Sequence, residues 1–165
     1  MQIYKVDLKG FDDDAYRTLG GRLNSVLDTF SLLKKEGFWV EIVTLLVPGF
    51  NDAEAQLRGM TKFIAAVSPD IPWHVTAFHS DYHMQETPNT PAKTLLRAAD
   101  IGREAGLRYV YAGNLPGRVD EYENTFCLKC RATLVERTGY FIRAVRVTKE
   151  GKCHKCGERV SGVWG

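Results

Sequence analysis

Four cysteines arranged as two pairs constrain this chain more than any other feature. The pairs are separated by 22 residues, and the chain contains no further cysteine. Two Cys-x-x-Cys pairs at such a separation are typical of zinc ribbons and rubredoxin-like knuckles. A disulfide framework would spread its cysteines through the chain instead. The sequence therefore predicts one tetrahedral metal site held by Cys127, Cys130, Cys153 and Cys156.

Structural zinc is the first interpretation of this cysteine group. Four thiolates leave no open coordination position, and a closed site of this kind stabilises a fold too small to rely on apolar burial. Iron in a rubredoxin-type site is the alternative, since a tetrahedral sulfur cage accepts either metal. His154 lies between two of the cysteines and is expected to be a solvated bystander. Residues 134–136 and 140–147 are expected to form the strands of a small hairpin.

The rest of the chain has the pattern of an α/β fold. Apolar runs rich in β-forming residues occupy residues 3–8, 39–47, 73–78 and 109–112, at intervals of roughly 35 residues, about the length of one βα unit. Amphipathic helical patterns lie between them, at residues 24–35, from residue 51 or 52 to 67, and from 91 to 105. Strands alternating with helices predict a parallel four-strand sheet with right-handed crossovers.

The pattern changes after Ala112, where a Gly- and Pro-containing loop begins. We therefore expect two domains, an α/β domain over residues 1–117 and a cysteine-containing ribbon over residues 118–165. With 165 residues and 44% hydrophobic content, the chain is long enough for one core of moderate size.

Charge and hydropathy weigh against nucleic acid and membranes as partners. The net charge is only +2, and no apolar run reaches the roughly 20 residues of a membrane-spanning helix. Basic residues do surround the cysteines, but they alternate with acidic ones and lack interleaved aromatics, so a solvated face is the preferred interpretation. They are Lys129, Arg131, Lys152, Lys155 and Arg159. A cytoplasmic protein is expected.

Polar residues end each of the four predicted strands. Ligands of parallel α/β folds bind at the carboxyl ends of the strands, so these residues are candidates for binding. Asp7 and Lys9 would point to the same side of the first strand, because strand side chains alternate. An ordinary surface ion pair explains them as well, and Asn51 and Asp52 can be explained as helix caps. The candidates by strand position are Asp7, Lys9, Thr44, His79 and Asn114.

Several segments together resemble a known family. They are Asp7-Leu8-Lys9-Gly10, Val47-Pro48-Gly49-Phe50-Asn51-Asp52, Thr76-Ala77-Phe78-His79 and Tyr109-Val110-Tyr111-Ala112-Gly113-Asn114-Leu115-Pro116-Gly117. In this order and spacing, they are similar to the C-terminal half of radical S-adenosylmethionine (SAM) enzymes related to pyruvate formate-lyase activating enzyme. The ending, Glu123-Asn124-Thr125 and then Gly162-Val163-Trp164, resembles the branch known as AmmeMemoRadiSam system radical SAM enzymes.

The resemblance implies a fold, a chemistry and roles for the candidate residues. The implied fold is a partial (β/α)6 barrel, of which this chain would form the C-terminal part. In the family, a Cys-x-x-x-Cys-x-x-Cys loop binds a [4Fe–4S] cluster that cleaves SAM, and the resulting 5′-deoxyadenosyl radical abstracts hydrogen from a protein or a small substrate. By position, Asp7 and Lys9 would hold the methionine end of SAM and His79 its ribose or adenine. Thr44 and Asn114 are further candidates at the rim.

One departure from the family is large, because no cysteine before position 127 could hold the cluster. We therefore expect the chain to be part of a longer or split enzyme and to be inactive alone. The outer edge of the first strand would then need a cover, either the missing N-terminal half or another chain, and would otherwise favour self-association. The alternative from a different class is a noncatalytic zinc-ribbon protein whose α/β domain is an interaction module.

Overall fold

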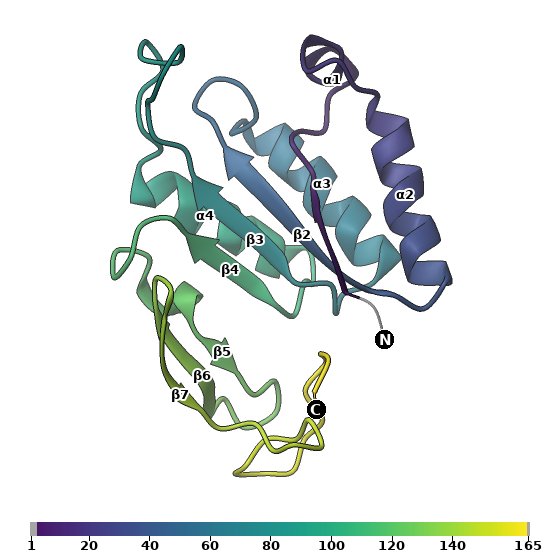
Figure 1. The fold of residues 1–165 in the computed structure, drawn as a ribbon, viewed down its shortest axis with the longest axis vertical. Coiled ribbons are helices and arrows are strands. Elements are labelled where there is room, and N and C mark those ends of the chain that lie inside the picture. Colours follow the sequence, from purple (N-terminus) through teal and green to yellow (C-terminus); the bar gives the residue numbers. More distant parts are fainter. Residues whose placement is uncertain (1–2, 165) are drawn as a thin grey trace.

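A computed structural model describes residues 3–164 and shows a parallel four-strand sheet joined to a small antiparallel one (Figure 1). The larger sheet has the order β1-β2-β3-β4. Its strands are β1 (Ile3–Asp7), β2 (Trp39–Leu46), β3 (Trp73–Ala77) and β4 (Val110–Gly113). All three neighbouring pairs are parallel, as the repeated βα pattern predicts.

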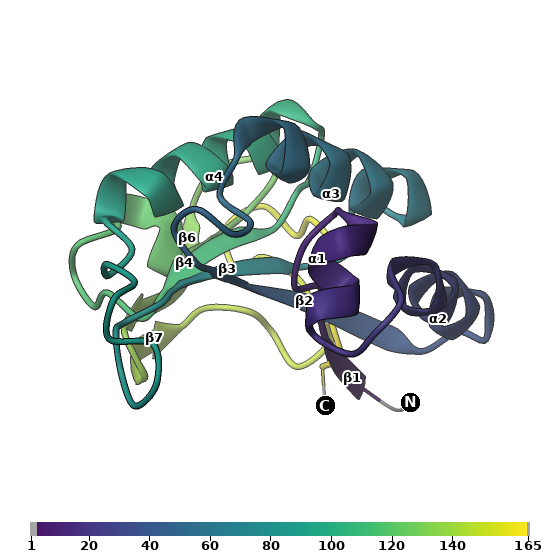
Figure 2. The same ribbon diagram turned by 90° about the horizontal axis from the view of Figure 1, so that it is seen from above.

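Four helices connect these strands, α1 (Asp13–Thr18), α2 (Leu23–Lys35), α3 (Glu54–Val67) and α4 (Ala92–Glu104). Strands in sequential order with crossovers of one hand place every helix on one face, and Figure 2 shows α2, α3 and α4 together on one side of the sheet. Gly37 and Gly106 follow two of the helices with φ of 81° and 94°, a left-handed conformation that ends a helix and that glycine adopts readily.

Burial alternates along the strands and separates the two faces of the sheet. In β2, Val40, Ile42, Thr44 and Leu46 are buried under the helices, and the residues between them are less buried. The core beneath the helices contains Phe30, Met60, Ile64, Trp73 and Leu95, all fully buried. The opposite face of the sheet therefore carries the side chains of the alternate positions and faces the ribbon.

The start of α3 differs from the expectation. Its N-cap is Ala53, which offers no side-chain cap, instead of Asn51 or Asp52. Asn51 is buried and joins three backbone groups: its amide donates to the carbonyls of Lys9 at 2.7 Å and Leu45 at 2.8 Å, and its oxygen accepts from the N–H of Val47. Backbone groups at the ends of two strands compete for this side chain, so it fixes the loop and does not cap the helix.

The smaller sheet has the order β5-β6-β7 and is antiparallel. Its strands are β5 (Thr125–Phe126), β6 (Thr133–Thr138) and β7 (Phe141–Val145), and a 3₁₀ helix, η1 (Asp120–Glu123), precedes them. The two longer strands confirm the hairpin expected from the sequence. Val119 and Tyr122 pack into the core of the larger sheet, so the segment just after residue 117 belongs physically to that core.

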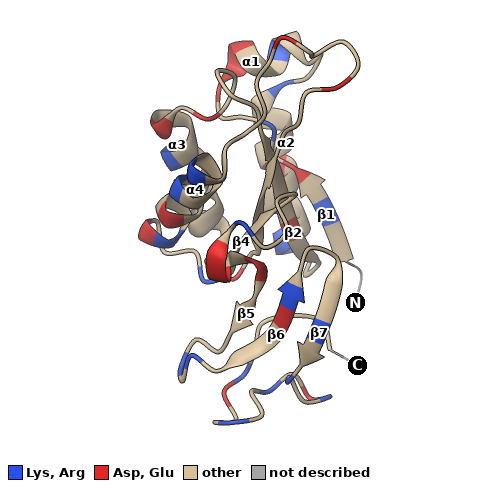
Figure 3. Cartoon of the chain, turned by 90° about the vertical axis from the view of Figure 1, so that its left-hand side faces the viewer, with Lys and Arg blue, Asp and Glu red and all other residues tan. Residues whose placement is uncertain are grey.

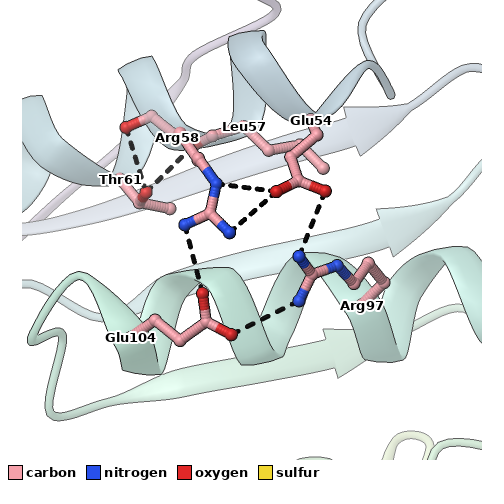
Figure 4. Close-up of polar contacts among 6 residues, drawn as sticks. All are labelled: Glu54, Leu57, Arg58, Thr61, Arg97 and Glu104. Atoms are coloured by element: carbon pink, nitrogen blue, oxygen red, sulfur yellow. Dashed lines mark hydrogen bonds and ion pairs between the residues drawn. The ribbon is translucent and has the colours of Figure 1, made fainter.

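Four charged side chains join α3 to α4 (Figure 4). Arg58 contacts Glu54 and Glu104, and Arg97 contacts the same two carboxylates, at distances from 2.7 to 3.3 Å. This charge ring is half-exposed on the outer helical face. Acidic and basic residues are interspersed on both helices in the view of Figure 3. Within residues 3–164, no helix is long and apolar enough to cross a membrane.

Candidate functional site

The four cysteine sulfurs lie together, with all Sγ atoms within 4.8 Å of one another. The Sγ of Cys127 is 3.5 Å from that of Cys156, and the Sγ of Cys130 is 3.7 Å from that of Cys153. Sulfurs around a tetrahedral Zn²⁺ at about 2.3 Å would be roughly 3.8 Å apart. The geometry of this group therefore suits a single metal ion bound by four thiolates.

The two Cys-x-x-Cys turns have equivalent backbone structures. The N–H of Arg131 donates to the carbonyl of Cys127 at 3.0 Å, and the N–H of Gly157 donates to that of Cys153 at 2.9 Å. The first cysteine of each turn also donates its own N–H to the residue five positions later, Ala132 or Glu158. Each pair thus forms a knuckle that exposes backbone N–H groups to sulfur.

These amides change the acidity of the thiols. Burial opposes ionisation of Cys127, but hydrogen bonds from the backbone N–H groups of Cys130 and Lys129 outweigh it and lower its pKa to about 7. Cys156 receives a backbone N–H from Glu158, yet burial and the neighbouring sulfurs raise its pKa to about 12. Four sulfurs cannot all carry negative charge without a cation between them, and a bound metal supplies that charge.

The cysteine group is packed against the larger sheet. Tyr109, which precedes β4, belongs to the same apolar cluster as Cys127, Leu134, Cys153 and Val160. Its hydroxyl accepts a hydrogen bond from the N–H of Ser161 at 3.2 Å. A metal bound by the cysteines would consequently hold the ribbon and the C-terminal segment against the sheet.

Asp7 and Lys9 meet at the carboxyl end of β1, as their alternation in the sequence predicts. The ammonium of Lys9 is 2.7 Å from Asp7 Oδ2, and both side chains are about half-exposed, at 52% and 54%. The backbone of Lys9 is fixed from both sides, because its N–H donates to the Tyr16 hydroxyl and its carbonyl accepts from Asn51. Burial raises the pKa of Tyr16, so this hydroxyl remains protonated near neutral pH.

His79 and Asn114 lie at the same carboxyl edge, just beyond β3 and β4. Both side chains are exposed. Asn114 has a φ of 66°, and its amide donates to the carbonyl of Ala77 at 3.2 Å, which connects the ends of the two strands. Both residues are accessible to a ligand at the rim of the sheet.

Thr44 lies in the core and not at the rim. It is fully buried on the helical face of β2, and its hydroxyl accepts the indole N–H of Trp73 at 2.9 Å. Thr44 lies within the second strand, as predicted, but side chains alternate between the two faces of β2, and the Thr44 side chain points toward the helices instead of the rim. Its hydroxyl is therefore engaged with Trp73 inside the core and does not face the rim.

A polar group on the opposite face of the sheet was not singled out from the sequence. His74 Nε2 is 3.1 Å from Glu41 Oε2, and the His74 ring stacks on Tyr111 with centroids 5.0 Å apart. The hydrogen bond from His74 lowers the pKa of Glu41 despite its partial burial. Strand alternation is the signal that could have identified this group. Glu41, His74 and Tyr111 each lie next to buried residues of their strands, so their side chains point to the opposite face of the sheet.

Comparisons with known proteins identify a longer relative by sequence. No family model matches the chain. An uncharacterized protein of Methanocaldococcus jannaschii is 38% identical over 160 residues, covering 96% of this chain and 47% of the relative. The chain thus spans about half the length of that relative.

A solved structure is similar in fold. It is the crystal structure of a domain of pyruvate-formate lyase-activating enzyme from Bacteroides vulgatus, with a TM-score of 0.60, 18% identity and 68% of each chain covered. About two thirds of this chain therefore has a fold similar to that of this domain, and its four-cysteine group has the composition and geometry of a metal-binding site.

Proposed function

We propose that this chain forms the C-terminal part of a radical SAM enzyme resembling pyruvate formate-lyase activating enzyme, with a structural zinc in its ribbon. The observation that carries the proposal is the fixed Asp7–Lys9 pair at the carboxyl edge of a sheet whose fold matches an activating-enzyme domain. The greater length of the Methanocaldococcus jannaschii relative supports the proposal that further chain completes the enzyme.

The residues at the rim suit part of SAM. Its methionine end carries a carboxylate and an amine beside the sulfonium, and Lys9 and Asp7 offer the complementary charges. Because Tyr16 and Asn51 hold the Lys9 backbone, both charges are positioned before a ligand arrives. We propose that His79 and Asn114 contact the nucleoside end.

A [4Fe–4S] cluster does not fit this chain at the sheet. All four cysteines of the sequence gather at the ribbon, and clusters of this type are held by cysteine thiolates. The proposed enzyme therefore takes its cluster from another segment, where cluster and SAM together supply the one-electron chemistry for hydrogen abstraction. This chain contributes the binding edge.

We propose that the segment with the cluster pairs with β1. Among residues 3–164, β1 has a strand neighbour on one side only, β2, and Ile3 is 57% exposed at that edge. Extending the sheet beyond β1 would build the partial (β/α)6 barrel and cover the edge.

The test uses a chimera of the longer Methanocaldococcus jannaschii relative, in which this chain replaces the matching 160 residues. After anaerobic purification, the chimera is expected to bind a cluster and to release 5′-deoxyadenosine from SAM under reducing conditions. Asp7→Asn with Lys9→Met should reduce the rate at least about tenfold through weaker SAM binding. Lys93→Met, an exposed lysine on α4, is the matched control and should leave the rate unchanged.

Two results would contradict the proposal. One is a chimera that binds no cluster although the unmodified relative does. The other is a rate of 5′-deoxyadenosine release that the double variant does not alter while its cluster content is normal.

An interaction module is the second candidate, and one surface favours it. Tyr140, Phe141, Ile142 and Val145, at the tip and along the edge strand of the ribbon, are 96%, 81%, 62% and 58% exposed. Exposed apolar side chains gathered in this way are typical of protein contacts. If the chain only binds a partner, Phe141→Ser with Ile142→Ser should abolish that association, and the chimera should release no 5′-deoxyadenosine.

A further inference from the structure

A cavity of about 470 Å³ lies between the face of the sheet without helices and the ribbon. Its lining includes residues from β1, β2, β3 and β4, from β6 and from the C-terminal segment. Of the residues proposed to bind SAM, Asn114 lines the cavity, whereas Asp7, Lys9 and His79 do not, so the cavity meets the proposed SAM-binding rim at Asn114 only. Its volume falls in the range of sites for small organic molecules.

The two carboxylates in this cavity are already engaged within the protein. Glu41 accepts the Trp39 indole N–H with one oxygen and contacts His74 with the other. Glu123 accepts the backbone N–H of Gly117 with one oxygen and that of Gly139 with the other. Each oxygen of the two carboxylates therefore already has one partner within the protein.

The cations of the cavity retain unused donors. The Lys5 side chain has no hydrogen bond or ion pair among residues 3–164, although its charge helps to lower the pKa of Glu41, and it lines the cavity from the β1 edge of the sheet. Arg137 lines it from the opposite side, beside Tyr111 of β4. The bonds of Arg137 to Thr125 and Glu123 use a single guanidinium nitrogen, Nη1. The Lys5 ammonium and part of the Arg137 guanidinium can therefore donate hydrogen bonds to a ligand in the cavity.

Aromatic side chains complete the walls. Trp39, Tyr109, Tyr111 and Trp164 all line the cavity and present apolar rings. From these observations we infer that the cavity binds a small organic carboxylate with an aromatic or apolar body, whose negative charge is met by Lys5 and Arg137. This inference is independent of the radical chemistry proposed above, because it concerns binding by this chain alone.

Three probes of one shape test the charge of the ligand. Indole-3-acetate, indole-3-acetamide and tryptamine carry a carboxylate, a neutral amide and an ammonium on the same ring. Each is titrated into the zinc-loaded, ¹⁵N-labelled chain while the three tryptophan indole N–H signals are followed by NMR. Trp39 and Trp164 report on the cavity, and Trp73, buried on the helical face, is the internal control.

We expect indole-3-acetate to shift the Trp39 and Trp164 signals and to bind at least about tenfold more tightly than the amide or the amine. The Trp73 signal should not move. Equal binding of all three probes, tighter binding of tryptamine, or no shift at Trp39 and Trp164 up to about 10 mM probe would overturn the inference.

Charge-removing variants locate the site. Lys5→Met combined with Arg137→Met should erase the preference for the carboxylate over the amide, and Lys93→Met on the far face should keep it. An unchanged Trp73 signal shows that the double variant is folded. Retention of the full preference by that folded variant would likewise overturn the inference.

Discussion

Arg131 and Gly157 occupy equivalent positions, each directly after the second cysteine of a knuckle and each with a positive φ, 58° and 73°. Glycine tolerates this conformation and other residues adopt it at a cost. Arg131 is held by further contacts, since its guanidinium lies 4.9 Å from the centre of the Phe126 ring and 3.4 Å from Glu121. The second knuckle has glycine at this position and needs no such support.

Gly157→Ala should therefore destabilise the ribbon by about 1 kcal/mol, because a Cβ is placed on a left-handed residue. The measurement is the rate of zinc loss to a chelator together with thermal unfolding. Lys155→Ala in the same knuckle is the control, since its backbone N–H still donates to Cys153. Equal zinc loss from the two variants would show that the turn does not need glycine.

Thr44→Val separates a packing role from a binding role. The substitution leaves the buried Trp73 indole N–H without its acceptor and should cost about 1–3 kcal/mol in unfolding free energy. Thr76→Val on the opposite face is the control, because its hydroxyl makes only a 3.5 Å contact. If the Thr44 variant were fully stable but bound SAM less tightly in the chimera, Thr44 would be a ligand residue after all.

The Glu41–His74 contact predicts a dependence of stability on pH. The folded protein holds the pKa of Glu41 below its ordinary value, chiefly through the hydrogen bond with His74. A lowered folded pKa adds stability above the unfolded pKa, and that stability is lost as the pH falls through the folded pKa. Glu41→Gln should thus cost about 1–2 kcal/mol at neutral pH and progressively less below about pH 4.5.

Urea denaturation of the chain and of Glu41→Gln at matched pH values measures this difference. Acid also releases the metal, but it does so from both proteins, so comparison at the same pH removes that contribution. A gap between the two proteins that stayed constant from pH 7 to pH 3 would contradict the role assigned to this pair.

The charge ring between α3 and α4 should contribute weakly and in a salt-dependent way. Hydrogen bonds from Arg58 and Arg97 lower the pKa of Glu54, yet all four side chains are half-exposed. Arg97→Met should lower the Tm by no more than about 2–4 °C at low salt, and the effect should shrink near 1 M salt, where screening acts within about 3 Å. Lys93→Met on the same helix provides the comparison, and an equal loss of Tm at both salt concentrations would point to packing instead.

The features that repeat in the sequence were predictable. Strand intervals and helix periodicity predict the parallel α/β order. The spacing of the cysteines predicts their convergence, because each pair forms a local turn and one ion requires both pairs. The predicted boundary at residue 117 and the ligand roles at the rim remain predictions.

The features that depend on tertiary contacts were not predictable in the same way. Asn51 has the residue type of a helix cap, yet it bonds to the backbone of Lys9, 42 positions away, which no local pattern reveals. The cavity arises only where the ribbon folds back beneath the sheet, so Arg137 and Tyr111 become neighbours without any shared motif. Strand parity did carry information on Thr44 and Glu41, because it assigns them to opposite faces.

The most direct test of this account is the metal content of the anaerobically purified chain compared with that of the chimera. The account predicts about one zinc and no iron for the chain alone, and about one zinc with four irons and acid-labile sulfide for the chimera. This result would place the cluster on the added segment and the zinc at Cys127, Cys130, Cys153 and Cys156. Several irons with sulfide on the chain alone would contradict it, since only these four cysteines could then bind the cluster.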